Sequence, residues 1–411
     1  MTSARSSLAP LLAVLTFAAL AGCASVPNGP PPAPAAAVVC PEPPAAAVAT
    51  VPPPLLPISF ANNLKPAAWA DLPGWNEDSL ADAFAGFVRS CLALKARSEW
   101  QRVCGDAAFL PARDEATLRR FFETDFTPYA VANPDGSAEG TITGYYEPLL
   151  RGSRRQTPVF HFPIHAVPDD LLVLDLGDIY PELKNLRLRG RIDGRRVVPY
   201  YSRADIEAGK GGGVGHEILW VDDAVDLFFL QIQGSGQITL DGGEVVRVSY
   251  ADQNGHPYRS VGRLLVERGE LGLDQASMQG IKAWGARNPD KLPELLNANA
   301  SYVFFREQPA NGGGPPGALG IPLTSGRSVA VDPRAIPLGA PVFLSTSWPN
   351  STLPLNRLML AQDTGGAIKG AARADFYWGT GEEAGAQAGK MRQSGRIWVL
   401  LPNGFPLNPG T

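Results

Sequence analysis

Residues 358–379, LMLAQDTGGAIKGAARADFYWG, contain the strongest fold signal in the sequence. The apolar start predicts a strand that ends at Asp363, and Thr364-Gly365-Gly366 predicts a sharp turn directly after it. Gly370 permits a second tight turn, after which Asp375 leads into an aromatic run. These two acids, each beside a turn, are therefore expected to converge in one groove.

Asp363 and Asp375 would suit general acid chemistry in such a groove. Neighbouring carboxyls shift each other's pKa, and apolar walls favour the protonated form. The spacing alone leaves a second interpretation open, in which both acids cap backbone N–H groups in turns. Asp363-Thr364-Gly365 also matches the catalytic loop of aspartic proteases. The chain has no second loop of this kind, so only a homodimeric protease would fit.

A third acid, Asp332, precedes Pro333 at the end of a predicted strand over residues 328–331. Arg327 and Arg334 lie close to it in the sequence. The pattern favours an Asx turn before proline over a role in chemistry.

The wider pattern predicts a mainly β protein with flanking helices. The 44 glycines are spread through the later chain, where short apolar runs alternate with turn residues. Helical spacing predicts a helix over residues 76–104 that is capped by Asn76, and two more over 114–124 and 274–298. Strands are expected over residues 141–146, 197–201, 227–233, 245–250, 328–331, 341–344, 358–362 and 397–401. Helices around two β-rich segments favour α+β or β-barrel domains over a doubly wound sheet.

The composition argues against several function classes. The net charge is −4, so the chain lacks the basic footprint of a nucleic-acid binder. The four histidines are scattered and there is no Cys-x-x-Cys motif, so we expect no metal site and no cofactor.

The N-terminus has the features of an exported lipoprotein. Residues 1–23 combine one cation, a short apolar run and small residues before Cys23, which we expect to be lipidated. Residues 24–57 are rich in Ala and Pro and predict an extended linker. Export implies an oxidising compartment, in which Cys91 and Cys104 either pair or stay as buried thiols. Cys40 in the linker is expected to pair with nothing.

Neutral polar and aromatic side chains cluster in two other segments. Thr143 and Tyr145 precede Glu147 at a predicted strand end, and Gln233 and Ser235 end the predicted strand over 227–233. Amides, hydroxyls and aromatic faces suit uncharged sugars. Each of these residues would equally fit an ordinary hairpin or the core.

Several motifs together resemble the membrane-bound lytic murein transglycosylase A family. The resemblance covers nearly all of the chain beyond about residue 70, and residues 330–379 also resemble the three-aspartate domain of other wall-active proteins. The motifs are GYYEP at 144–148, FFLQIQGSG at 228–236, NGHPYRSVG at 254–262, SYVFF at 301–305, AVDPRAIPLG at 330–339, DTGGAIKG at 363–370 and DFYWG at 375–379. The segment between Gly370 and Asp375 departs from the family pattern, because it is a residue longer than usual.

The resemblance implies two domains with a deep groove between them. Residues 58–147 and 309–411 would form a double-psi β-barrel, whose three-aspartate segment spans 328–401. Residues 148–308 would form a second, inserted β-barrel domain. The protein would be a monomer anchored to the periplasmic face of the outer membrane by its lipid.

The resemblance also implies the reaction and its residues. Asp375 would be the single acid and base of a peptidoglycan exotransglycosylase that forms 1,6-anhydromuramic acid ends without water, and Asp363 would tune it. The residues themselves do not distinguish cleavage within a glycan strand from cleavage at its end. The expected substrate-binding residues are Thr143, Tyr145, Gln233, Ser235, Asp332 and Lys369, although Lys369 also fits a solvated turn.

Two competing functions remain open from the sequence. A polysaccharide hydrolase on the same barrel would use Asp363 as base and Asp375 as acid, and would leave reducing ends. A non-catalytic wall-binding lipoprotein would use the groove only for retention.

Overall fold

The computed structural model describes residues 60–407, except 61, 184–185, 187, 212–214 and 311–312. The predicted signal segment, Cys23, Cys40 and the linker over 24–57 lie outside the described residues. Within the described ranges, no helix combines the length and the apolar character needed to cross a bilayer.

The larger sheet is built from strands far apart in the sequence. Its order is β1-β2-β17-β14-β15-β13-β16-β3, and an additional β17–β3 pairing closes six of these strands into a ring. The strands are β1 Leu64–Pro66, β2 Phe126–Val131, β3 Gly140–Glu147, β13 Ser328–Val331, β14 Pro341–Ser347, β15 Pro354–Asp363, β16 Arg373–Thr380 and β17 Arg392–Pro402. The strands predicted near 141, 328, 341, 358 and 397 are thus confirmed. The double-psi crossing of this barrel stays a prediction.

The second sheet comes from the middle of the chain. Its order is β12-β11-β10-β4-β9-β5, and its two end strands also contact each other. The strands are β4 Leu149–Ser153, β5 Phe162–His165, β9 Glu217–Val221, β10 Ser235–Leu240, β11 Val245–Gln253 and β12 Val303–Pro309. A small third sheet contains β6 Leu172–Val173, β7 Arg189–Asp193 and β8 Arg196–Pro199. The domain boundaries at residues 147/148 and 308/309 stay predictions.

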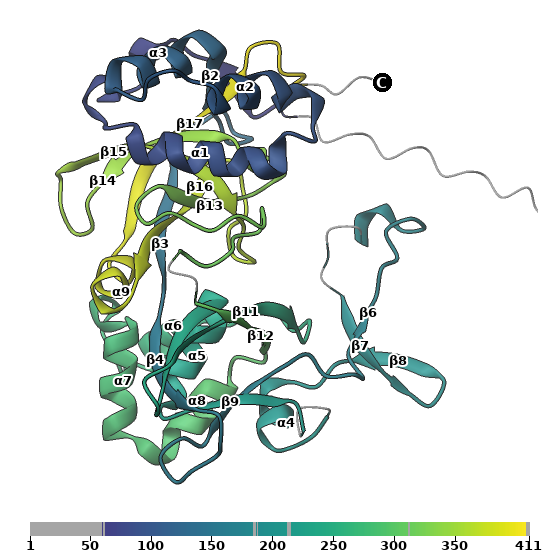
Figure 1. Cartoon of the computed structure of the whole chain (residues 1–411). Helices are drawn as coiled ribbons and strands as arrows, with labels where there is room; N and C mark the ends of the chain where they lie inside the picture. Colours follow the sequence, from purple (N-terminus) through teal and green to yellow (C-terminus); the bar gives the residue numbers. More distant parts are fainter. Residues whose placement is uncertain are drawn as a thin grey trace, which may run out of the picture. The chain divides into compact units, whose positions relative to one another are not determined.

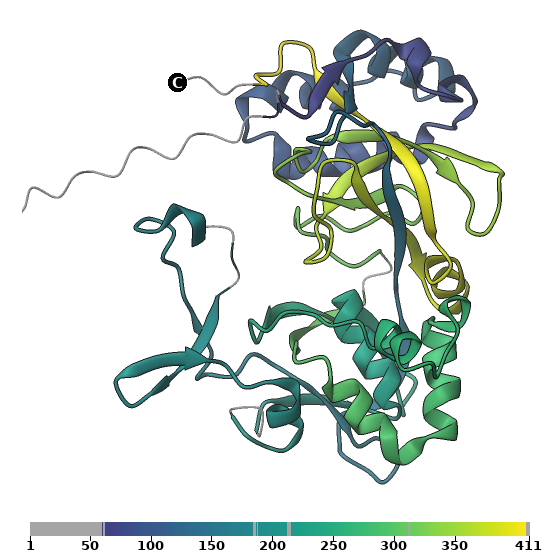
Figure 2. The same cartoon turned by 180° about the vertical axis from the view of Figure 1, so that it is seen from behind.

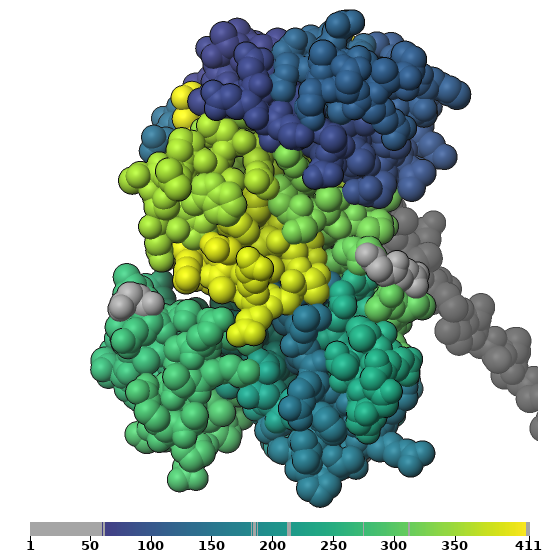
Figure 3. All heavy atoms as spheres, turned by 60° about the vertical axis from the view of Figure 1, so that its left-hand side comes forward, coloured from purple at the N-terminus to yellow at the C-terminus, as the bar shows by residue number. Residues whose placement is uncertain are grey.

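Helices cover both larger sheets. They are α1 Ala81–Leu94, α2 Ser98–Ala108, α3 Glu115–Asp125, α4 Arg203–Glu207, α5 Ala224–Gln233, α6 Val261–Glu267, α7 Met278–Arg287, α8 Leu292–Asn297 and α9 Glu382–Ala388. The three N-terminal helices α1–α3 pack on the larger sheet (Figures 1 and 2). Figure 3 shows these N-terminal residues in purple and blue, packed in one body with the yellow-green C-terminal strands.

The predicted helix over residues 76–104 was wrong in its extent and its cap. Asn76 lies in a 3-10 turn, and α1 begins only after Leu80. The chain breaks between Leu94 and Ser98 and restarts as α2, which lets both helices lay an apolar face on the same core. A cystine between Cys91 and Cys104 joins them, as one of the two alternatives predicted.

A cluster of aromatic rings fills the space between these helices and the sheet. Phe84 and Phe87 on α1 meet Phe121 and Phe122 on α3 in edge-to-face and tilted contacts, with ring centroids 5.5–6.3 Å apart. Such pairs stabilise a core beyond the area they bury. This cluster fixes the helical layer on the barrel.

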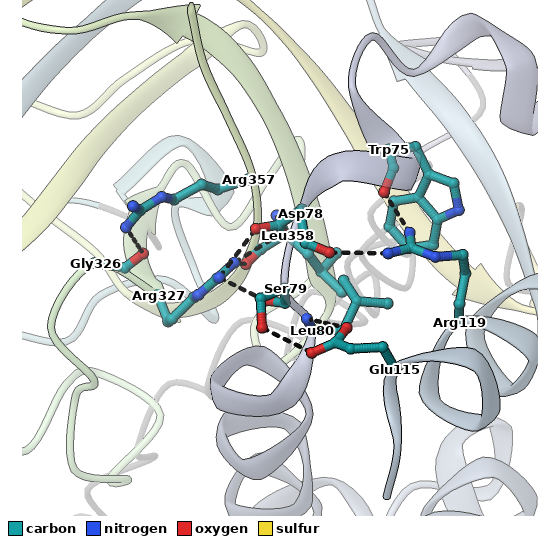
Figure 4. Close-up of polar contacts among 10 residues, drawn as sticks. All are labelled: Trp75, Asp78, Ser79, Leu80, Glu115, Arg119, Gly326, Arg327, Arg357 and Leu358. Carbon is teal, nitrogen blue, oxygen red and sulfur yellow. Dashed lines mark hydrogen bonds and ion pairs between the residues drawn. The ribbon is translucent and has the colours of Figure 1, made fainter.

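A buried ion pair ties the start of α1 to the C-terminal strands (Figure 4). Two nitrogens of Arg327 donate to the carboxylate of Asp78 at 2.8 and 3.0 Å, and the Leu358 N–H donates to the same carboxylate at 2.7 Å. Arg327 also donates to the Ser79 carbonyl, while Glu115 accepts from the Leu80 N–H at the start of α1. Because every charge here has hydrogen-bond partners, the pair fixes the start of α1 against the C-terminal strands without leaving a buried charge unsatisfied.

The predicted strand over residues 227–233 was wrong, because this segment forms helix α5. Asp223 accepts from the Val225 and Asp226 N–H groups and so caps the helix, and Gly234 ends it with a φ of 79°. These are ordinary helix start and stop signals. As a result Gln231 is buried against Arg203, and Gln233 does not share a strand face with it.

Strand β3 joins the two larger sheets through a second buried ion pair. Glu147 at its end is fully buried and accepts from Arg247 on β11 at 2.6 and 3.2 Å. Gln237 on β10 and Thr380 on β16 donate to the same carboxylate at 3.0 and 2.8 Å. One side chain therefore links strands of both sheets.

The Cys91–Cys104 cystine closes a short loop, so its loss should destabilise the helical layer. We expect the Cys91→Ala/Cys104→Ala variant to lose about 3 kcal/mol of unfolding free energy, the value typical of a loop of this size. Urea unfolding followed by circular dichroism measures the change. Dithiothreitol should weaken the natural chain by a similar amount and leave the variant unchanged. Equal sensitivity of both proteins to the reductant would contradict the pairing.

Candidate active site

The two predicted catalytic acids lie on either side of strand β13. Ala330 pairs with Asp363 on the parallel strand β15 and with Asp375 on the antiparallel strand β16. Asp375 in turn pairs with Thr143 on β3, and Thr143 pairs with Arg392 on β17. Neighbouring strands are about 4.8 Å apart, so the Cα atoms of the two acids are roughly 10 Å apart.

An irregularity in β15 places Asp363 in the row of paired residues that crosses the sheet from Asp363 through Ala330 and Asp375 to Thr143. Val329 pairs with Ala361, whereas the next residue, Ala330, pairs with Asp363, so Gln362 is an extra residue in the strand. Such a bulge re-aims the side chain that follows it. Gln362 itself is buried and bonds to Ser328 and to Ser90 on α1.

The Asp375 carboxyl sits deep among protein atoms but keeps a path to solvent. Its residue is half-buried, and Oδ1 accepts a hydrogen bond from the Thr143 hydroxyl at 2.5 Å. Burial, with a smaller effect from the charge on Asp363, raises the pKa of Asp375 to about 6, against the opposing effects of the Thr143 bond and the Arg373 guanidinium. No bond from the described residues reaches Oδ2. The group can therefore carry a proton near neutral pH and present it to a ligand.

Arg373 acts on Asp375 both through its charge and through a bond to Thr143. One of its nitrogens donates to the Thr143 hydroxyl oxygen at 2.8 Å, and another donates to the Thr141 carbonyl at 3.2 Å. Within the described part of the chain, Asp375 forms no ion pair with this or any other arginine. The Thr143 hydroxyl accepts from Arg373 and donates to Asp375, which orients that carboxyl.

Asp363 is held more firmly than Asp375. Its Oδ1 accepts from the Ala318 and Thr364 N–H groups, both at 2.9 Å, and its Oδ2 accepts from the Tyr145 hydroxyl at 2.9 Å. The Tyr145 ring packs on Tyr377 with centroids 5.2 Å apart. Burial and the charge of Asp363 raise the pKa of Tyr145, so the phenol stays protonated and donates to the carboxylate.

The remaining expected binding residues are distributed unevenly around this row. Gln233, at the end of α5, accepts from the Tyr146 N–H on β3 at 3.1 Å, and Ser235 follows at the start of β10. Asp332 instead bonds to Arg334 at 2.6 Å and to the Gly370 N–H at 2.9 Å. Lys369 is exposed and has no bond to any described residue. The structure thus brings Thr143, Tyr145 and both acids together, but not Asp332 and Lys369.

A pocket of about 460 Å³ lies along the continuation of β16 beyond Asp375. Tyr377, Gly379 and Thr380 supply one wall. The second sheet and the segment before β13 supply the rest, through Gln237, Val245, Ala310, Gly313, Gly314, Leu323 and Ser325. Tyr377 lies two residues after Asp375 on β16, so the two side chains point to the same face of the sheet. The described residues contain no group of His, Cys, Asp or Glu side chains that could hold a metal ion.

Sequence reasoning missed two arginines near the acids. Arg373 lies two residues before Asp375 on a strand, and this period of two was a usable signal that both face the same side. Arg392 lies on another strand, and only the β3–β17 register places it beside Thr143.

Comparisons with known proteins agree on one family. The MltA specific insert domain matches residues 141–306, and the 3D domain matches residues 327–401. Membrane-bound lytic murein transglycosylase A of Escherichia coli K12 is 33% identical over 312 residues, which are 74% of this chain and 73% of that protein. A crystal structure of MltA from Neisseria gonorrhoeae has a TM-score of 0.73 and 41% identity, covering 83% of this chain and 93% of that one. A structure of Escherichia coli MltA with bound chitohexaose has a TM-score of 0.62 and 28% identity, covering 79% and 90%.

The raised pKa of Asp375 should be visible in the stability of the fold. Between pH 4 and pH 6 the folded protein keeps a proton that unfolded Asp375 has lost, so stability falls as the pH rises through this window. Asp375→Asn removes this titration. Its melting temperature relative to the natural chain should therefore increase between pH 4 and pH 7, as measured by thermal unfolding.

Asp332 provides a control, because its pKa is shifted in the opposite direction from that of Asp375. Although burial opposes ionisation, the Arg334 and Gly370 bonds hold the pKa of Asp332 at about 2. Asp332→Asn should lower the melting temperature at pH 7, and the deficit should shrink as the pH falls below 4. A melting difference for Asp375→Asn that is constant from pH 4 to pH 7 would contradict the proton assignment.

Proposed function

The chain belongs to the membrane-bound lytic murein transglycosylase A family, whose members cleave peptidoglycan as lyases, and we propose that Asp375 is its single acid and base. The bond cleaved would be the β-1,4 link from N-acetylmuramic acid to N-acetylglucosamine, and the product would end in 1,6-anhydromuramic acid. The proposal rests on the state of the Asp375 carboxyl. Its pKa is about 6, and its Oδ2 forms no hydrogen bond with any described residue.

In the first step, protonated Asp375 would donate to the oxygen that links the two sugars. The bond from C1 to that oxygen breaks, and positive charge develops at C1. A general acid is most effective when its pKa lies near the working pH. A value of about 6 leaves part of the population protonated at neutral pH, whereas an ordinary aspartate would be almost fully ionised.

In the second step, the Asp375 carboxylate would take the proton from the C6 hydroxyl of the same muramic acid. The C6 oxygen then attacks C1 and closes the anhydro ring, so the proton returns to Asp375 and no water is consumed. An intramolecular nucleophile benefits from proximity, and it needs no second catalytic carboxyl. Asp363 would tune Asp375 through its charge rather than react.

The glycan would lie along the face that carries Asp375. A relative with 28% identity binds chitohexaose, a chain of neutral sugars, which supports a groove for a glycan backbone in this chain as well. Thr143 and Tyr145 would act mainly by orienting the two acids. Gln233 and Ser235 would contact sugar hydroxyls, because the Gln233 Nε2 and the Ser235 hydroxyl bond to no described residue.

The remaining site and anchoring assignments rest on the sequence. Asp332 would act indirectly, by holding the turn that contains Lys369. Cys23 would carry the lipid that fixes a monomeric enzyme to the periplasmic face of the outer membrane. Residues 24–57 would act as a spacer that lets it reach the wall.

A hydrolytic mechanism fits this geometry less well. It would require Asp363 to activate a water molecule, yet three donors already engage its two oxygens. Product analysis distinguishes the two mechanisms, because hydrolysis leaves reducing ends whereas the proposed reaction leaves anhydro ends.

The acid and base assignment can be tested on purified murein sacculi. Asp375→Asn should lower anhydromuropeptide release by at least a thousandfold, because both proton transfers depend on this carboxyl. Asp363→Asn should lower it less, because only tuning and anchoring are lost. Mass spectrometry of the released products measures both effects. Retained release by Asp375→Asn, or reducing-end products from the natural chain, would refute the mechanism.

The Thr143 bond should set the pH profile of the reaction. Thr143→Val removes a bond that holds the pKa of Asp375 down, so that pKa should rise above about 6. The alkaline limb of kcat/KM should then move to higher pH, and kcat should fall roughly tenfold because the carboxyl loses its orientation. Thr143→Ser keeps the hydroxyl and should keep the natural profile. An unshifted limb in Thr143→Val would show that this bond does not tune the acid.

A further inference from the structure

Two arginines without carboxylate partners share the face that carries Asp375. Among the described residues, Arg373 donates only to Thr141, Thr143 and Ala374, and Arg392 makes no side-chain bond. Other described arginines do form such pairs, as Arg189 does with Asp252 at 2.8 Å. The unused donors of the two side chains are therefore available to a ligand.

The strand register places both arginines on one side of the sheet. Arg392 pairs with Thr143, and Arg373 pairs with Thr141 two residues earlier on the same strand. Paired residues on neighbouring strands project to the same face, as do residues two apart on one strand. Asp375 pairs with Thr143 from the other side. The two guanidinium groups thus flank β3 on the face of the candidate acid.

The two like charges influence each other. Burial lowers the pKa of Arg373 against the opposing charge of Asp375, and Arg392 lowers it further. Two cations side by side are unfavourable until an anion neutralises them.

A second pocket, of about 330 Å³, adjoins this position. Arg392, Thr141 and Ser394 line it from the same face, together with Glu139, Gly140 and Gln393. The one acid present, Glu139, accepts from the Ser394 hydroxyl at 3.2 Å and forms no ion pair with Arg392. The pocket has room for a substituent that branches from a glycan lying over Asp375.

We propose that Arg373 and Arg392 form a carboxylate-binding site for the acidic substituent of the muramic acid bound beside Asp375. The proposal rests on the function proposed above and names the substrate group that this part of the site takes. Guanidinium groups match carboxylates in shape and charge, and such bonds are stronger than those between neutral groups. The carboxylate belongs either to the peptide stem or, on stripped glycans, to the lactyl group itself.

Binding of this carboxylate would also favour the acid form of Asp375. The Arg373 charge holds the pKa of Asp375 down, and a bound anion offsets that charge. A correctly substituted sugar would thus help to protonate the group that cleaves it.

The test compares Arg392→Gln with the natural chain on three glycans. The first is murein with peptide stems, the second is strands stripped by an amidase, which frees the lactyl carboxylate, and the third is chitohexaose, which has no carboxylate. Arg392→Gln should raise KM roughly tenfold on at least one carboxylate-bearing glycan, and should leave the Kd for chitohexaose within twofold. On the same glycan kcat should fall to a smaller extent, because a loosely held carboxylate offsets the Arg373 charge less well. Arg392→Lys should recover part of the loss. The glycan affected identifies the source of the carboxylate.

Arg396→Gln is a matched control on the same strand. Arg396 is also exposed, lies four residues along β17, and stacks over Trp398 at 4.8 Å. It should leave all three substrates unaffected. An unchanged KM in Arg392→Gln, or an equal loss on chitohexaose, would overturn the proposal. If the natural chain releases no anhydro products, the proposed function fails instead, while Kd values for stripped strands and chitohexaose still test the carboxylate site.

Discussion

The pairing of β13 with its two neighbours is the constraint on which the candidate site depends. Ala330 faces Asp363 on one side and Asp375 on the other, and the bulge at Gln362 brings the first of these acids into the row. A slip of one residue in either strand would turn an acid into the core, because side chains alternate between faces. The backbone hydrogen bonds of three strands therefore decide that the two carboxyls share one surface.

The proton on Asp375 reflects a balance between burial and bonding. Burial favours the neutral carboxyl, whereas the Thr143 bond and the Arg373 charge favour the ionised one. Among the described residues Arg373 forms no ion pair with Asp375, but its charge and its bond to the Thr143 hydroxyl both favour the ionised form. The result is a pKa of about 6, which lets one group release and regain a proton near neutral pH. The proposed transglycosylation would use a single carboxyl with this property.

The errors in the sequence-based predictions have two causes. Residues 227–233 are apolar enough for a strand, yet Asp223 and Gly234 cap them as helix α5, and packing against α7 and the second sheet uses the apolar face. The long helix predicted from residue 76 is instead two helices joined by a cystine. For residues 227–233 the capping signals at Asp223 and Gly234 decide the element type. For residues 76–104 neither α1 nor α2 begins at a side-chain cap, so the break between them was not marked by a capping residue.

The sequence by itself determined the family and most strands of the barrel, because motifs and strand periodicity are written in neighbouring residues. It also named the two candidate acids, and it left a Cys91–Cys104 pair as one of two alternatives. Tertiary structure alone decided that Asp332 is bonded to Arg334 and that Arg392 lies beside Thr143. It also decided that Asp363 is anchored, while one oxygen of Asp375 bonds to no described residue. These relations join strands that are far apart along the chain. They depend on strand register and burial, which set both distances and the pKa of Asp375 and which no local pattern encodes.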